Sequence, residues 1–352
     1  MRRDLRILDS DAHVIEPGHL FGPWSSPGTP VMELPATTPS VPCGDFALLA
    51  DQFEHGFDAP SYLRAMDRQG IDAVVLYPSI GLFAPFQPEL DAGASADACR
   101  AYNDWIADYC ATDPGRMAGA GLVPLADVKL ASAEAARCGQ LGLVAVMVRP
   151  NRLYGGNLGD PWLDPLYEAV AGAGLVLAVH EGLGIRGPTT GADRFTTFVE
   201  RHACSHPMEQ MTALLSLVMG GALERHPALR VAFLESGTGW LPYWLDRLDE
   251  HAEWLAATEC EILSLRPSEY FARQCMISTD PEDRLSPWVV GLLGAGNLAW
   301  ASDFPHPDAI FPGAVEATLA AWLDHSTLAV ADASRVLWDN PLTFYRLDQR
   351  FG

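Results

Sequence analysis

The chain has 352 residues, of which 45 are acidic and 23 are basic, so its formal net charge is −22. This charge repels phosphate backbones and anionic lipid surfaces, which argues against nucleic-acid and membrane partners. Hydrophobic residues make up 49% of the chain, enough for a large buried core, which excludes disorder as the overall description.

The N-terminal sequence MRRDLRILDSDAH lacks the apolar stretch of a signal peptide, and no apolar run reaches the roughly 18 residues of a membrane span. The seven cysteines are odd in number and show no CxxC spacing, which is typical of reduced thiols rather than of a disulfide framework or a cysteine-type zinc site. These features predict a cytoplasmic protein.

Short apolar runs alternate along the chain with segments of helical spacing, such as 161–173, 208–224 and 314–324. The runs are almost uniformly apolar, as expected of parallel strands that are covered on both faces. We expect strands at 6–9, 73–77, 119–123, 144–148, 175–179, 230–234, 275–278 and 298–301. About eight β–α units without a break in composition predict a single domain over 1–352 that is a (β/α)8 TIM barrel. An open doubly wound sheet is the alternative, but no GxGxxG follows the first strand.

Two irregular stretches follow expected strands. Residues 22–60 are rich in Pro, Gly and Ser and come after the first strand, and residues 183–205 come after the fifth. Both would emerge on the C-terminal face of the barrel, where long loops often cover a site. We therefore predict a lid insertion at 22–60.

Imidazole and carboxylate side chains stand at the ends of four expected strands: Asp11 and His13, His180, Glu235, and Asp303. Each one alone has a structural explanation, as a turn cap or a hydrogen-bonded core residue. Together they would meet at one rim of a barrel, because the carboxyl ends of its strands lie on one face. Neutral imidazoles and carboxylates suit zinc, manganese or iron, so the pattern predicts a metal site.

His206 begins the segment His-Pro-Met-Glu-Gln-Met, and Pro207 is well suited to the first turn of a helix. A helix that starts near the rim would let His206 reach the same cavity. An ordinary surface histidine at a helix start is the alternative.

Five segments together resemble a known family: 8–13 (LDSDAH), 178–182 (AVHEG), 226–235 (HPALRVAFLE), 239–248 (GWLPYWLDRL) and 301–306 (ASDFPH). They resemble the amidohydrolase-related barrels, a group that includes the aminocarboxymuconate-semialdehyde and resorcylate decarboxylases. The resemblance runs in order from residue 5 to about residue 347. It implies that Asp11, His13, His180 and Asp303 hold a metal.

The chain departs from those decarboxylases at Glu235, because the resemblance implies a histidine there that acts as acid and base or polarises the substrate. A carboxylate beside a metal is more naturally a ligand or a bridge. With His206, the set becomes three histidines and three carboxylates, which is too many for a mononuclear hydrolytic site that keeps a position open for water. Six ligands suit two metals.

The pattern is similar to the barrel-fold non-haem diiron monooxygenases of platensimycin- and platencin-type diterpenoid biosynthesis. This similarity implies two iron ions, O2 and an electron donor, and hydroxylation of a bulky apolar substrate of secondary metabolism that is CoA-linked or carboxylate-bearing. Asp11, His13, His180 and Asp303 would hold the first iron, and His206 and Glu235 would hold the second or bridge the pair.

Other residues are assigned supporting roles. Glu181 and His306 would orient the ligands, and Trp105 would cover an apolar substrate. Arg149 and Arg152 would face an anionic part of the substrate. Ordinary packing and surface ion pairs are the structural alternatives for these aromatic and basic residues.

The main rival function is a mononuclear zinc or manganese hydrolase or non-oxidative decarboxylase, in which Glu235 is the general base and His206 is incidental. A barrel that only binds a small molecule is a third class. Whether copies of the chain associate stays open, because the aromatic segment 240–244 suits packing within the barrel or between subunits.

Overall fold

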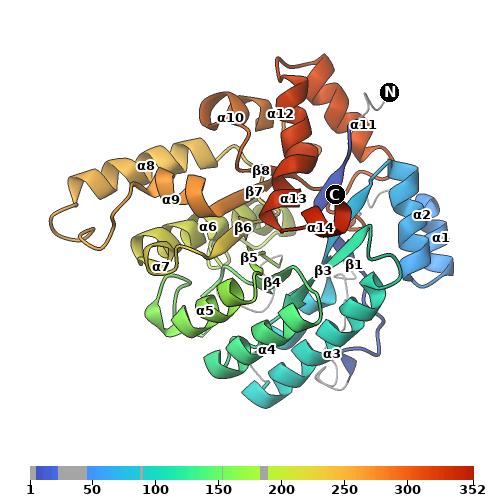
Figure 1. Ribbon diagram of the computed structural model, residues 1–352, viewed down its shortest axis with the longest axis horizontal. Coiled ribbons are helices and arrows are strands. Elements are labelled where there is room, and N and C mark those ends of the chain that lie inside the picture. Colours follow the sequence, from blue (N-terminus) through green and yellow to red (C-terminus); the bar gives the residue numbers. More distant parts are fainter. Residues whose placement is uncertain (1–4, 23–45, 88–89, 153, 183–188) are drawn as a thin grey trace.

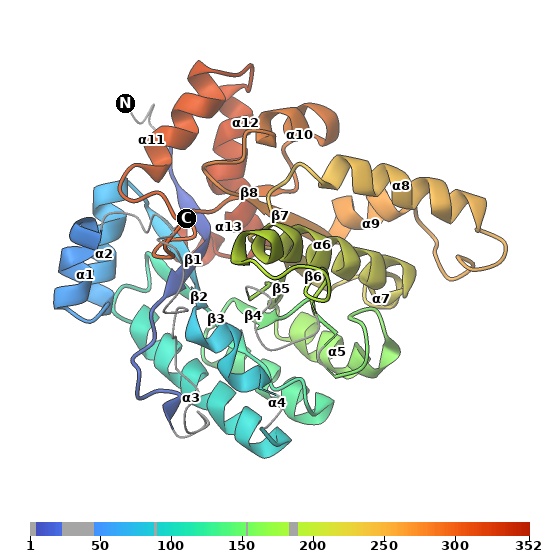
Figure 2. The ribbon, with the colours of Figure 1, turned by 180° about the vertical axis from the view of Figure 1, so that it is seen from behind.

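A computed structural model describes residues 5–22, 46–87, 90–152, 154–182 and 189–352 of the chain. Its eight strands form one sheet in sequential order, and each neighbouring pair from first to last is parallel. The strands are β1 (Leu8–Val14), β2 (Ala73–Pro78), β3 (Met117–Leu122), β4 (Ala145–Val148), β5 (Val176–Val179), β6 (Arg230–Phe233), β7 (Cys275–Thr279) and β8 (Leu298–Trp300). Helices surround this sheet in both ribbon views (Figures 1 and 2), so the predicted (β/α)8 barrel is confirmed.

Hydrogen bonds between the first strand and the segment around the end of the last one close the barrel. The backbone N–H of His13 donates to the carbonyl of Phe304 at 2.7 Å, and the N–H of Asp303 donates to the carbonyl of Asp11 at 3.1 Å. The hydroxyl of Ser10 donates to the carbonyl of Trp300 at 2.7 Å. The polar residues of β1 are therefore held directly beside those that follow β8.

Helices fill the crossovers between strands, as the right-handed β–α–β connection of parallel strands requires, and the last four helices follow β8. The helices are α1 (Ala50–Glu54), α2 (Ala59–Gln69), α3 (Ala92–Cys110), α4 (Val128–Gln140), α5 (Asp164–Gly172), α6 (Phe198–Met219), α7 (Ala222–Arg225), α8 (Leu241–Trp254), α9 (Pro267–Gln274), α10 (Ser286–Leu293), α11 (Ala314–Leu319), α12 (Val330–Ser334), α13 (Asn340–Phe344) and α14 (Asp348–Phe351). Short 3-10 turns cover Phe46–Leu49, Ile80–Leu82, Ala84–Phe86 and Pro161–Leu163, and π-helical turns cover Ala320–Asp324 and Arg335–Asp339. None of the described helices is both long and apolar enough to cross a membrane.

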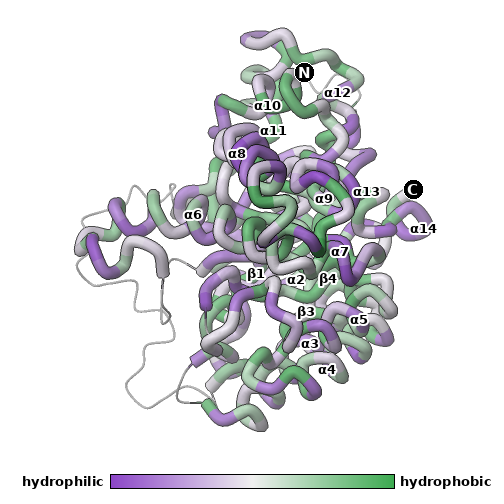
Figure 3. The backbone as a smooth tube through the Cα atoms, turned by 90° about the vertical axis from the view of Figure 1, so that its left-hand side faces the viewer, coloured by the Kyte–Doolittle hydropathy of each residue, from purple (hydrophilic) through white to green (hydrophobic). Residues whose placement is uncertain are grey.

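Helix α6 corrects two expectations. It starts at Phe198 rather than near Pro207, because Thr197 and Glu200 form a capping box that satisfies the first backbone donors. Pro207 lies inside the helix, and the stretch 198–205, which was expected to be irregular, is helical. Figure 3 shows α6 on a part of the chain that reaches out to one side of the barrel.

The predicted lid insertion at 22–60 is described only in part. Residues 23–45 lie outside the described residues, and 46–60 contain a 3-10 turn, α1 and the start of α2. The lid stays a prediction.

Every residue of β1 is buried, although four of the seven, Asp9, Ser10, Asp11 and His13, are polar. The strand shifts register against β2 between Asp9 and Ala12, as at a β-bulge. Bulges re-aim side chains and are common beside active sites. Because buried polar groups are costly without partners, this strand indicates where the functional site lies.

Candidate metal centre

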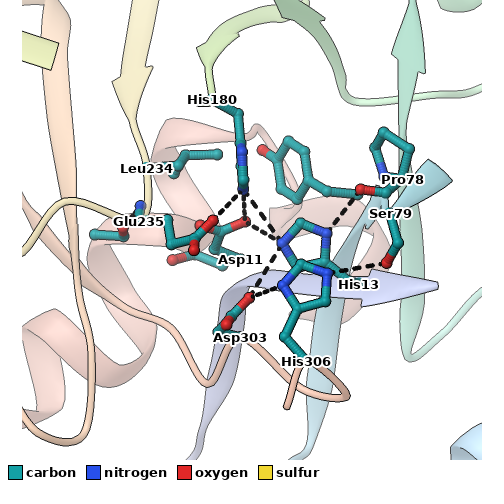
Figure 4. Close-up of polar contacts among 12 residues, drawn as sticks. Asp11, His13, Pro78, Ser79, His180, Leu234, Glu235, Asp303 and His306 are labelled. Carbon is teal, nitrogen blue, oxygen red and sulfur yellow. Dashed lines mark hydrogen bonds and ion pairs between the residues drawn. The ribbon is translucent and has the colours of Figure 1, made fainter. Parts of the chain in front are cut away.

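Two histidines and one aspartate meet inside the C-terminal mouth of the barrel (Figure 4). Nε2 of His13, on β1, lies 3.2 Å from Nε2 of His180, which follows β5. Oδ1 of Asp11 lies 3.7 Å from the first nitrogen and 3.6 Å from the second. All three residues are buried.

In each histidine, a hydrogen bond at the other ring nitrogen, Nδ1, determines which nitrogen carries the proton. Nδ1 of His13 donates to the carbonyl of Pro78 at 2.8 Å, and Nδ1 of His180 donates to the carbonyl of Glu181 at 2.6 Å. Burial lowers the pKa of His180 to about 3, and burial followed by the nearby imidazoles lowers that of His13, so both rings are neutral. Each Nε2 therefore carries a lone pair, and the two lone pairs face each other without a proton between them.

Two further carboxylates adjoin these nitrogens. Oδ1 of Asp303 lies 3.3 Å from Nε2 of His13, and Oε2 of Glu235 lies 3.4 Å from Nε2 of His180. Asp303 has a φ of 57° and Glu235 a φ of 50°, a left-handed backbone that L-residues with side chains rarely adopt. Such strain costs about 1–3 kcal/mol per residue and collects at functional sites. Here it occurs just after the strands, at the second residue after β6 and at the third residue after β8.

The donor set fits a divalent cation. Oδ1 of Asp11 is buried and has no hydrogen-bond partner among the described residues. Burial and the neighbouring carboxylates raise the pKa of Asp11 and of Glu235 well above the ordinary range of a carboxyl group. Two acceptors that face each other repel, and so do carboxylates that lie close together. A cation between them would turn both repulsions into attractions.

His306 extends this cluster toward the edge of the site. Its ring stacks on His13 with centroids 3.9 Å apart, and its Nδ1 lies 2.7 Å from Oδ1 of Asp303. Its Nε2 lies 3.0 Å from the hydroxyl of Ser79. Burial lowers the pKa of His306, but the charge of Asp303 and the hydrogen bond to it outweigh burial, so the net direction is upward. The buried Glu16 accepts backbone N–H groups of Ser79 and the two residues after it, which fixes this loop.

His206 lies beside the cluster, in the interior of α6 rather than at the start of a helix. Its Nε2 lies 3.4 Å from Oε1 of Glu235 and 3.9 Å from Oε2 of Glu181. Burial lowers the pKa of His206 to about 4, which keeps the ring neutral.

The residues predicted to bind substrate are placed differently. Arg149 is buried, and its Nη2 lies 3.3 Å from Oε1 of Glu181, so its charge is already paired. Arg152 is exposed and donates to the carbonyl of Gly155 at 2.8 Å. Trp105 lines a separate cavity of about 350 Å³, with Tyr109 and the residues that begin α2. None of the three is among the cluster contacts described above.

Sequence reasoning missed two residues. Asp280 directly follows β7, and the rule that found Asp303 after β8 would also have found it. Its Oδ1 is buried without a hydrogen-bond partner in the described structure, and its charge helps to raise the pKa of Asp11 and of Glu235. His202 lies one helical turn before His206 on α6, and it was missed because that stretch was not expected to be helical.

Comparisons with known proteins find decarboxylases. The chain is 26% identical over 253 residues to a 2-amino-3-carboxymuconate-6-semialdehyde decarboxylase of Dictyostelium discoideum, a match that covers 71% of this chain and 67% of that one. It is 26% identical over 305 residues to a gamma-resorcylate decarboxylase of Polaromonas sp., covering 82% and 87%. A solved dihydroxybenzoic acid decarboxylase of Polaromonas sp., with bound manganese and the inhibitor 2-nitroresorcinol, has a TM-score of 0.72 at 19% identity and covers 98% of each chain.

These comparisons contradict the predicted oxygenase. The named relatives remove carboxyl groups, so the prediction of a dinuclear iron monooxygenase, and with it the oxidoreductase class, is wrong. The expected requirements for two iron ions, O2, an electron donor and a CoA-linked substrate gain no support, because the metal named in a similar structure is manganese and the ligand is a small aromatic molecule. The prediction failed because it rested on a resemblance to diiron monooxygenases and on a count of six ligands, and a set of ligands does not identify the reaction.

The rival reading, a mononuclear metal enzyme of the decarboxylase type, agrees better with the relatives. The family model described as amidohydrolase matches residues 9–347, nearly the whole chain. The protein therefore belongs to the amidohydrolase family.

Proposed function

We propose that the protein is a non-oxidative decarboxylase of a small conjugated carboxylic acid, and that it holds one divalent cation with Asp11, His13, His180 and Asp303. The observation that carries this proposal is the pair of Nε2 lone pairs that face each other at 3.2 Å beside Asp11. A divalent cation between the two nitrogens and the carboxylate would make this arrangement favourable. The decarboxylase names of the relatives support the reaction class.

Manganese or zinc is the proposed metal, because imidazole and carboxylate ligands suit both ions and a similar structure holds manganese. When bound, the cation would supply the positive charge that holds an anionic carboxylate and an adjacent oxygen of the substrate. The protein contributes the rest of the chemistry.

The reaction needs one proton and no oxidant. A proton adds to the carbon that bears the carboxylate, the bond between that carbon and the carboxylate breaks, and its electron pair restores the conjugated system as CO2 leaves. We propose His306 as the proton donor, acting directly or through Asp303, because its Nδ1 lies 2.7 Å from Oδ1 of Asp303. Its side chain is 18% exposed, so the proton can be replaced from solvent.

Glu181 is proposed as a positioning residue. Its backbone carbonyl accepts Nδ1–H of His180, which fixes the tautomer and the orientation of that ring. Its side chain accepts from Asn151 at 3.0 Å and pairs with Arg149. Loss of its charge would therefore act on the site through these neighbours.

The test is an assay of metal-loaded protein against conjugated and aromatic carboxylic acids, starting with γ-resorcylate and 2-amino-3-carboxymuconate-6-semialdehyde. The protein is first treated with a chelator and then reloaded with Mn²⁺ or Zn²⁺. We expect release of one CO2 per substrate consumed, in reloaded protein and not in the chelated sample. Activity that survives complete removal of metal would contradict the proposal.

A metal-dependent hydrolase is the second candidate, and Glu235 is the observation that favours it. Oε2 of this buried carboxylate lies 3.4 Å from Nε2 of His180, where a general base for a water nucleophile would stand. Hydrolysis of lactone or amide substrates without CO2 release would identify this activity in place of decarboxylation.

A further inference from the structure

A buried carboxylate outside the metal cluster contacts both segments that carry the acidic ligands. Asp9 lies on β1, two residues before Asp11, and is 1% exposed. Its Oδ2 accepts a hydrogen bond from the hydroxyl of Ser302 at 2.5 Å, and its Oδ1 accepts one from the backbone N–H of Ser302 at 3.0 Å. The same Oδ1 accepts the backbone N–H of Asp11 at 3.4 Å. The side chain of Asp9 therefore joins β1 to the segment that follows β8.

On the β8 side, these contacts fix both chain neighbours of Asp303. Ser302, just before it, is held by Asp9 at its backbone and at its hydroxyl. Phe304, just after it, donates its backbone N–H to the hydroxyl oxygen of Ser302 at 3.1 Å, and its carbonyl accepts the backbone N–H of His13. The φ of Asp303 is 57°, a conformation that persists only where the surrounding structure holds it. Asp9 supplies part of this support through Ser302.

On the β1 side, Asp9 supports the irregularity that places Asp11. The strand shifts register against β2 between Asp9 and Ala12, and a bulge disrupts the regular hydrogen bonds of the ladder. The carboxylate of Asp9 accepts the N–H of Asp11, two residues on, as short polar side chains commonly do. The carbonyl of Asp11 in turn accepts the N–H of Asp303 at 3.1 Å. The two acidic ligands are therefore linked by one backbone hydrogen bond and by one buried carboxylate.

The acidic ligands need such support because their charges repel each other. Burial, and after it the charge of Asp303, raise the pKa of Asp11. Without a cation, this repulsion favours separation of the two carboxylates. Contacts that keep them together in the metal-free fold reduce the rearrangement that metal binding requires, and they raise the affinity for the metal in this way.

We propose that Asp9 is a positioning residue, which keeps Asp11 and Asp303 in place for the divalent cation. Its hydrogen bonds, rather than its charge, produce this effect. The inference rests on the metal site of the proposed function and not on the reaction. One rival explanation is that Asp9 only attracts the cation by its charge. The other is that Asp9 only stabilises the fold.

Three variants and a control separate these explanations. Asp9→Ala removes both the charge and the contacts. Asp9→Asn removes the charge alone, because an amide oxygen still accepts the two backbone N–H groups and the amide N–H donates to the hydroxyl oxygen of Ser302. Ser302→Ala keeps the charge of Asp9 and removes the hydroxyl contacts, so it also serves where Asp9→Ala fails to fold. Asn103→Ala is the matched control, because this buried side chain fixes the end of β3 through both backbone groups of Leu122.

The first measurement is calorimetric titration of the stripped full chain with Mn²⁺, at a temperature at which each variant is folded. We expect Asp9→Ala and Ser302→Ala to bind Mn²⁺ about 10–100-fold more weakly than the wild type, the usual effect of replacing a group that orients a metal ligand. Asp9→Asn should bind at least about tenfold more tightly than Asp9→Ala. Asn103→Ala should match the wild type. Equal affinities of Asp9→Ala and Asp9→Asn, or wild-type affinity in Ser302→Ala, would overturn the proposal.

The electron paramagnetic resonance spectrum of bound Mn²⁺ is a second readout, which a loss of stability alone does not change. Its shape depends on the arrangement of the ligands. At full metal loading, we expect an altered spectrum in Asp9→Ala and the wild-type spectrum in Asn103→Ala. A wild-type spectrum in loaded Asp9→Ala would show that Asp9 does not position the ligands. Affinities in the expected order support this inference even where no CO2 is released, whereas a wild type that binds no divalent cation contradicts both proposals.

Discussion

Nδ1 of His306 lies 2.7 Å from Oδ1 of Asp303, while the ring of His306 stacks on His13 and its Nε2 lies 3.0 Å from the hydroxyl of Ser79. The imidazole therefore contacts the predicted metal ligands His13 and Asp303 (Figure 4), and its side chain is 18% exposed. Proton donation by His306 can therefore be tested separately from metal binding by Asp303 and His13, because His306 can be replaced while both ligands are kept.

His306→Asn is expected to lower kcat by about 10²–10⁴-fold, the usual contribution of general acid catalysis. The proposed divalent cation should stay bound in this variant. Steady-state kinetics and metal analysis of the same preparation check this. Ser79→Ala is the milder comparison and should lower kcat by a smaller factor, since it removes only one contact of the ring. Metal loss in parallel with activity would show that His306 supports the metal rather than the proton transfer.

His180→Asn is expected to lower metal affinity by more than about 100-fold, because loss of a direct ligand costs more than loss of a group that orients one. Activity should fall with metal content. Titration with Mn²⁺, followed by thermal unfolding with and without metal, measures both effects. The surface substitution His251→Asn is the control and should bind metal as the wild type does. Wild-type affinity in His180→Asn would rule out the proposed ligand set.

Metal affinity is expected to rise with pH. In the metal-free protein, burial and neighbouring carboxylates raise the pKa of Asp11 and of Glu235, so a cation displaces protons from these groups. Because these pKa values are raised in the metal-free fold, they add to its free energy of unfolding at pH values below the ordinary carboxyl range. This contribution is lost as the pH rises. Bound metal compensates for the loss, because it stabilises the ionised carboxylates. The difference in melting temperature between metal-loaded and metal-free protein should therefore grow from about pH 5 to about pH 8.

Calorimetric titration in buffers of different ionisation enthalpy measures the protons released on metal binding. The ligands His13 and His180 should contribute none near neutral pH, because burial lowers the pKa of both rings, that of His180 to about 3. Metal binding without proton release would contradict this electrostatic description of the site.

Arg149→Met is expected to destabilise the metal-loaded protein by about 3–5 kcal/mol, because it leaves the buried Glu181 without its charge partner. Arg152→Met, at an exposed position three residues later, should change stability by less than about 0.5 kcal/mol. Urea denaturation of both variants measures the difference. Equal stability of the two variants would show that the buried pair contributes little.

Much of the fold was predictable because seven of the eight strands are short, largely apolar runs that are covered on both faces. The exception is β1, which extends to Val14, five residues beyond the predicted end. Its second half was missed because it contains polar residues, which are buried in the candidate site and break the apolar pattern of a strand. Local patterns also misplaced the start of α6, where proline was taken as a helix start although the capping box at Thr197 begins the helix earlier.

The candidate site was predictable where a strand end carries the side chain, as for His180, Glu235 and Asp303. It was not predictable where geometry depends on distant partners. The left-handed backbone at Glu235 and the pairing of Arg149 with Glu181 follow from packing between elements, which no local pattern contains. Function failed for a different reason, since a set of ligands does not identify the reaction.

The most direct test is anomalous diffraction from crystals of the protein loaded with Mn²⁺, recorded on both sides of the manganese absorption edge. Our account predicts a peak bounded by the side chains of Asp11, His13, His180 and Asp303. An empty cavity at full metal loading, or a peak that none of these four side chains contacts, would contradict it.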